Sequence, residues 1–121
     1  MLEIIKKLEL INEMDHYYDA LEIISKYPIN GRKFKEMLQQ ALISNNIEIT
    51  RKRLDTIKGY SDYTYMKKKW KVELRQKKRS EPSWTDTLEC LMKFLEPIWD
   101  CMETNMVFIG DWMPQIKRFL D

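Results

Sequence analysis

Glycine, proline, cysteine and histidine are all scarce in this chain of 121 residues, which contains 3, 4, 2 and 1 of them respectively. Few glycines allow few tight turns, whereas an all-β fold needs many hairpins. Gly31, Gly59 and Gly110 stand too far apart to form a phosphate-binding loop, a dinucleotide fingerprint or a nucleophile elbow. The composition therefore favours a mostly helical chain.

Catalytic and metal-binding residue patterns are also missing. His16 is the single histidine, which excludes a metal site that needs two or more histidine ligands. Cys90 and Cys101 are too few for a disulfide framework and, on one helix, would lie about 16 Å apart, beyond bridging distance. We interpret them as reduced thiols of an intracellular protein, cytoplasmic or nuclear. We expect no enzyme activity, no metal and no cofactor.

Long apolar runs are absent as well, and none approaches the roughly 20 residues that span a bilayer. Shorter apolar stripes recur instead at helical spacing along most of the chain. They predict helices over residues 2–11, 12–27, 32–44, 47–58, 63–79, 84–105 and 111–120. Asp62 is expected to cap the fifth of these, Ser83 the sixth and Asp111 the last, and Pro97 to end or kink the sixth. The apolar residues 106–109, between Asn105 and Gly110, are expected to form a buried connector. The length suits one domain, residues 1–121. We expect an all-α fold, a compact irregular bundle of about five to seven short helices, with no membrane association.

Charge is distributed unevenly along the chain. Residues 1–60 carry 10 basic and 9 acidic side chains (+1), residues 61–80 carry 8 and 2 (+6), and residues 81–121 carry 3 and 8 (−5). On a helix, six of the central basic residues share an arc of about 120° beside the apolar arc that holds Trp70. These six residues, here called the basic face, are Lys67, Lys68, Lys71, Arg75, Lys78 and Arg79.

The basic face has several interpretations. Six cations on one helix face could neutralise the phosphates of DNA or RNA. The same residues could bind an acidic protein or serve as a nuclear-import signal. They could also be solvated, or pair within the fold with the acidic last third of the chain.

The last third is rich in aromatic residues and methionine. Between residues 84 and 119 it holds Trp84, Phe94, Trp99, Phe108, Trp112 and Phe119, with Met92, Met102, Met106 and Met113 among them. Aromatic residues and methionine are enriched at protein interfaces, although a small domain also buries them in its core. We expect partner contacts at Trp99, Met102, Met106 and Trp112.

Two stretches resemble known families. Residues 63–95, with KKKW, ELR, a tryptophan and MKFL in that order, are similar to the third helix and tail of the MADF branch of Myb/SANT-like DNA-binding domains. Residues 2–58 resemble, in hydrophobic pattern, the helical N-terminal domain of elongation-factor-like transcription proteins. The two resemblances assign overlapping helices to different folds, so no family is assigned.

These observations lead to one main functional expectation and one alternative. The first is a non-enzymatic helical interaction or adaptor module that binds a protein partner, or a second copy of itself, through the last third of the chain. The alternative is a DNA- or RNA-binding domain that uses the basic face.

Overall fold

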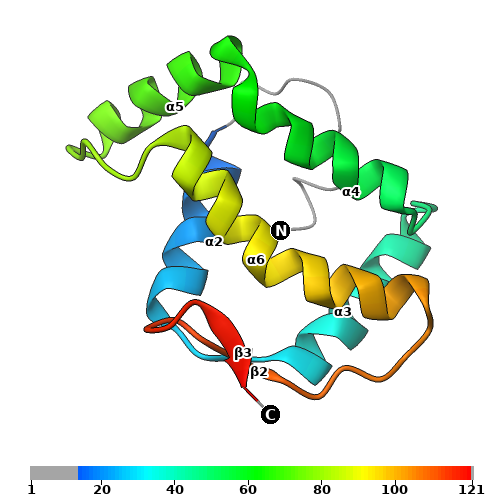
Figure 1. Ribbon diagram of the computed structural model, residues 1–121. Helices are drawn as coiled ribbons and strands as arrows, with labels where there is room; N and C mark the ends of the chain where they lie inside the picture. Colours follow the sequence, from blue (N-terminus) through cyan, green and yellow to red (C-terminus); the bar gives the residue numbers. More distant parts are fainter. Residues whose placement is uncertain (1–13, 121) are drawn as a thin grey trace.

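One long helix, α6 (Trp84–Glu103), organises the fold of this computed structural model, which describes residues 14–120. Eleven of its twenty residues are buried. Four helices pack against it (Figure 1): α2 (Asp15–Lys26), α3 (Gly31–Ser44), α4 (Arg51–Lys58) and α5 (Thr64–Gln76). A short 3-10 helix, η1 (Gly59–Asp62), joins α4 to α5. The helix expected over residues 2–11 lies outside the described residues.

The helix boundaries follow local capping chemistry. The Ser83 side chain accepts a hydrogen bond from the Asp86 amide, 3.1 Å away, which confirms the cap expected at the start of α6. Asn30 and Thr50 cap α3 and α4 in the same way. Asp62, which was expected to cap α5, instead ends η1. Pro97 lies inside α6, which continues past it to Glu103.

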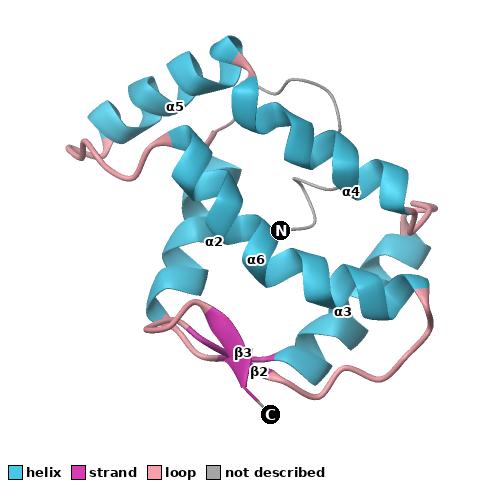
Figure 2. Cartoon of the chain, viewed as in Figure 1, coloured by secondary structure: helices cyan, strands magenta, loops and turns pink. Residues whose placement is uncertain are grey.

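A small antiparallel sheet completes the fold and corrects the all-α expectation. Its strands are β1 (Ile29–Asn30), β2 (Asp111–Met113) and β3 (Arg118–Leu120), in the order β1-β2-β3. Figure 2 shows this sheet at one end of the helical assembly. The chain is thus mostly helical but not purely so.

The helix predicted over residues 111–120 is wrong, because this segment forms the β2–β3 hairpin. Trp112 and Phe119 were expected on one helix face; they face each other across the hairpin instead, with ring centroids 5.2 Å apart. Lys117 adopts a φ of 51° in the connecting turn, which an α-helix does not allow. Pairing of β2 with β1, 80 residues earlier in the chain, further favours the extended conformation.

The four tryptophans form hydrogen bonds that connect the core to helix ends and loops. Each indole N–H donates a hydrogen bond to a backbone carbonyl that is distant in sequence: Trp70 to Pro82, Trp84 to Tyr60, Trp99 to Thr50 and Trp112 to Ile24, at 2.7–3.0 Å. All four rings are at most 2% exposed. The expectation that Trp70 belongs to the core is therefore confirmed. A buried indole needs such a partner, because an unpaired polar group in the core is destabilising.

Candidate binding surfaces

The titratable groups of residues 14–120 form no candidate metal site. Within this range, no three His, Cys, Asp or Glu side chains come together in a way that could hold a metal ion. Burial raises the pKa of the Cys90 thiol, which keeps it in its weakly nucleophilic form. None of the helices described is long and apolar enough to cross a membrane.

The residues expected to contact a partner separate into two groups. Trp99, Met102 and Trp112 are 0%, 4% and 0% exposed, so the structure places them in the core and not on a contact surface. Met106 is 61% exposed. The helical spacing of Leu88, Leu91 and Leu95 continues to Ile98, Trp99 and Met102, and this signal could have identified the last two as core residues.

The exposed apolar side chains of the last third are other residues than the buried Trp99, Met102 and Trp112. Val107 is 69%, Ile109 65% and Ile116 51% exposed, and together with Met106 they lie on the segment after α6 and on the hairpin turn. The buried connector expected over residues 106–109 is therefore wrong for Met106, Val107 and Ile109, because apolar composition alone does not show whether an irregular segment is covered.

The backbone of residues 106–110 is fixed at both ends. The Met106 carbonyl accepts a hydrogen bond from the Lys35 Nζ at 2.7 Å. The Met106 amide donates a hydrogen bond to the Cys101 carbonyl at 2.9 Å. At the other end, the Gly31 amide donates to the Gly110 carbonyl at 3.0 Å. Lys35 is itself only 9% exposed, so its ammonium is held under the segment. The apolar side chains therefore project from an anchored backbone.

A groove of about 650 Å³ lies between this segment, α6 and the hairpin. We call it the C-terminal groove. Its apolar walls are formed by Pro97, Val107, Phe108, Ile109, Ile116 and Phe119. Phe108 and Phe119 are half-buried, with ring centroids 4.8 Å apart in an edge-to-face contact. Phe119 also stacks on the buried Phe94. The groove floor is thus continuous with the core.

Charged residues on the rim of the C-terminal groove are all basic. They are Lys93 on α6, Lys117 in the hairpin turn and Arg118 on β3. All three are exposed, and none forms a salt bridge with another residue in the described range. The rim therefore adds positive charge to an apolar surface.

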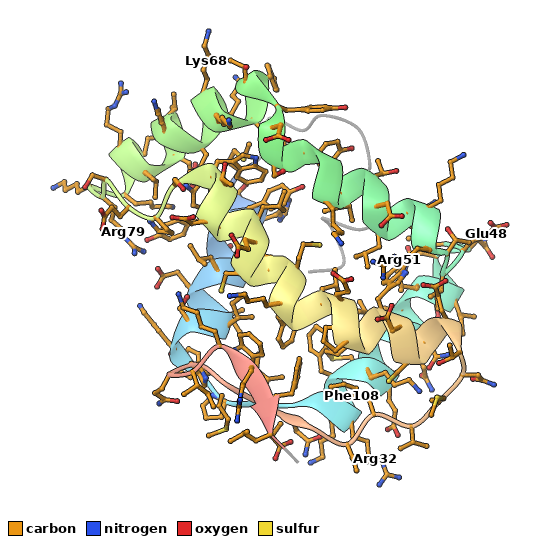
Figure 3. The ribbon with its side chains drawn as sticks, in the orientation of Figure 1. Arg32, Glu48, Arg51, Lys68, Arg79 and Phe108 are labelled. Carbon is orange, nitrogen blue, oxygen red and sulfur yellow. The ribbon has the colours of Figure 1, made fainter. Side chains whose placement is uncertain are left out.

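The basic face lies on α5 and on the loop that follows it, and its last residue, Arg79, lines a pocket together with Lys93 and Lys117 of the groove rim. Figure 3 shows Lys68 pointing away from the body of the protein, whereas Phe108 lies at the opposite end. Lys67, Lys68, Lys71, Arg75 and Lys78 are exposed, and none forms a salt bridge within residues 14–120. All six predicted residues are thus exposed, and five of them have no salt bridge in the described range.

Arg79, the sixth residue of the basic face, turns back onto α2. Its guanidinium donates to the Tyr18 hydroxyl at 3.2 Å and forms a salt bridge with Glu22. A hydrogen bond from Lys26, together with the charge of Arg79, lowers the pKa of the Glu22 carboxyl. Arg79 therefore joins the loop after α5 to α2.

The acidic residues of the last third do not neutralise the basic face. Glu96 and Asp100 of α6 form salt bridges with Arg51 at 2.7 and 2.9 Å, and Glu96 also pairs with Lys58 at 3.2 Å. Both cations belong to α4. The acidic last third was expected to pair with residues 61–80. Glu96 and Asp100 pair with α4 instead, because α4 packs directly on α6.

A second apolar groove, of about 400 Å³, lies between α2 and α3. Its rim includes Ile23 and Met37, which are 51% and 64% exposed. The helical spacing of Phe34, Met37, Leu38, Ala41 and Leu42 predicts that Met37 packs inward. The buried residues of α3 are instead Gly31, Lys35, Leu38 and Leu42. This groove was not predicted.

Comparison of the chain with protein-family models, with curated proteins and with solved structures found no match.

Proposed function

We propose that this protein is a non-enzymatic interaction module that docks a protein partner through the C-terminal groove and the apolar side chains beside it. The observation that supports this most directly is the exposure of Met106, Val107 and Ile109 on a backbone held by Lys35 and Gly31. Apolar side chains on an anchored segment lose little conformational entropy when they bind. Contiguous exposed apolar patches commonly mark protein interaction sites.

Photo-crosslinking tests this proposal. A benzophenone amino acid at Val107 is expected to yield adducts of discrete mass in extracts of the cells that make the protein, and Ile109→Asp is expected to abolish them. The same probe at Ile43, which is 62% exposed on α3, is the matched control. If Val107 yields no adduct beyond that control, the proposal is wrong.

The basic face supports a second candidate function, nucleic-acid binding. Five exposed cations without salt bridges in the described range lie on a helix of 13 residues and the loop after it. Such a helix is about 20 Å long and could enter a major groove about 12 Å wide. Binding of labelled duplex and single-stranded probes over a range of salt concentrations tests this function.

A further inference from the structure

The three basic residues of the last third converge on one groove. Residues 81–121 contain Lys93, Lys117 and Arg118 as their only cations, and all three line the C-terminal groove. The same third contains seven acidic residues within the described range, and none of them lines it. Residues 81–121 have a net charge of −5, yet all three of their basic side chains surround this exposed apolar surface.

Two acidic residues on either side of the groove residue Pro97 are directed toward α4. Glu96, which precedes the groove residue Pro97, binds Arg51 and Lys58 of α4, and Asp100 binds the same arginine. Asp86 and Glu89 line a neighbouring pocket with Lys93 and Lys117 but form no salt bridge with them within residues 14–120. Three cations around one groove repel one another, and an anionic ligand relieves that repulsion. The apolar floor of Phe108 and Phe119 would be left uncovered by a ligand that carried charge alone.

Resting on the proposed function, we infer that the C-terminal groove binds a partner segment in which apolar side chains are flanked by carboxylates. Its apolar residues would cover Phe108 and Phe119, and its acidic residues would lie beside Lys93, Lys117 and Arg118. The groove volume of about 650 Å³ lies in the range of about 300–1,000 Å³ typical of ligand pockets. The exposed side chain of Met106, which precedes the groove residue Val107, extends the apolar surface beyond the groove, and this fits a peptide better than a small molecule.

Three labelled peptides of 12 residues test this inference by fluorescence anisotropy with the full chain. The first combines two leucines and a phenylalanine with aspartate and glutamate; the second has lysine in place of each acid; the third has serine in place of each apolar residue. We expect the first to bind about tenfold more tightly than the other two, since the second places lysines beside the basic rim and the third leaves the apolar floor uncovered. Equal binding of the three peptides, or no binding of the first, would overturn the inference.

Two pairs of variants locate the binding site. Lys117→Glu with Arg118→Glu is expected to weaken the acidic peptide at least about tenfold, while Lys67→Glu with Lys68→Glu on α5 is expected to leave its affinity unchanged. Methyl NMR of the unaltered protein gives a readout that does not depend on variants folding. The acidic peptide should shift the signals of Ile109 and Ile116 and leave that of Ile43, on α3, in place. The reverse pattern would overturn the assignment to this groove.

Competing occupants give different results. A dimer in sedimentation equilibrium that Val107→Asp dissociates would identify a second copy as the occupant, and DNA that displaces the acidic peptide and shifts Ile109 would identify a nucleic acid. Either outcome overturns the inference. Photo-adducts at Val107 without any preference for the acidic peptide would also overturn it, while leaving the proposed function in place. If the probe at Val107 yields no adducts at all, the proposed function itself is wrong.

Discussion

The amide of Gly31 donates a hydrogen bond to the carbonyl of Gly110, 3.0 Å away, and the same carbonyl oxygen lies only 2.1 Å from where a Cβ on residue 31 would be. The Phe108 ring closes the other side of this position, at 2.4 Å. The backbone at Gly31 does not have a positive φ, so the glycine is needed for close approach and not for an unusual conformation. This contact joins the start of α3 to the segment that forms the C-terminal groove.

Gly31→Ala is expected to destabilise the protein by about 1–3 kcal/mol, the usual effect of overpacking. Because the added methyl group displaces Phe108, the variant should also yield fewer photo-adducts at Val107. Urea unfolding and the crosslinking assay measure the two effects.

Gly59→Ala is the matched control for that substitution. Nothing lies within 4 Å of a Cβ at Gly59, whose φ of −64° suits any residue. The alanine should therefore leave stability unchanged or raise it by about 0.4–1 kcal/mol, through a less flexible unfolded chain. Equal destabilisation by both alanines would contradict the close-packing argument.

Helical periodicity predicted α3, α4, α5 and α6 closely, because each has an apolar stripe and a local cap or break. It failed at residues 111–120, where Trp112, Ile116 and Phe119 have helical spacing but form a hairpin. The competing contacts are Trp112 with Ile29 of β1 and with the Ile24 carbonyl, both more than 80 residues away. Local spacing cannot reveal pairing at that sequence distance.

The candidate sites show the same contrast. Four residues of the basic face were predictable because they depend on angles around a single helix, and all six are exposed, although Lys78 and Arg79 lie beyond the end of α5. Arg79 deviates because Tyr18 and Glu22 approach it from α2. The C-terminal groove was not predictable, since it combines α6, an irregular segment and a hairpin turn, and no sequence pattern placed Lys93 beside Lys117 and Arg118.

Trp112→Phe tests whether this tryptophan stabilises the fold or contacts a partner. The substitution removes the indole N–H that donates to the buried Ile24 carbonyl at 2.7 Å. Leaving that acceptor unpaired should lower the free energy of unfolding by about 1–3 kcal/mol, with no change in the mass of the adducts formed at Val107. Ile116→Asp, at an exposed position of the same hairpin, should have the opposite profile: unchanged stability and fewer adducts. A Trp112→Phe protein of normal stability that has lost its adducts would make Trp112 a contact residue after all.

Stability should fall in acid partly through Glu96. Hydrogen bonds from Arg51 and Lys58, opposed by partial burial, lower the pKa of this carboxyl in the folded protein. A depressed folded pKa gives stability that is present above the unfolded value of about 4.3 and is lost as the pH falls through the folded pKa. Urea unfolding between about pH 7 and 3 should therefore show a shallower acid loss for Glu96→Gln than for the parent protein. Glu103→Gln, an exposed control at the end of α6, should retain the parent's slope. Identical curves for Glu96→Gln and the parent would remove Glu96 from this role.

The basic face offers a comparison between two arginines four residues apart. Arg75 is exposed and forms no salt bridge within residues 14–120, whereas Arg79 binds Tyr18 and Glu22. If the basic face binds nucleic acid, Arg75→Gln should weaken binding of every probe and reduce the slope of log affinity against log salt by about 1, because one phosphate contact is lost. Arg79→Gln should leave that slope nearly unchanged and lower the thermal stability instead, because it removes the contacts of the loop after α5 with Tyr18 and Glu22 of α2. Reversing both Lys71 and Arg75 to Glu should abolish binding, since two attractive contacts become repulsive. If no duplex or single-stranded probe binds the parent protein at low salt, the nucleic-acid candidate fails and the exposed cations of α5 serve only as a solvated helix face.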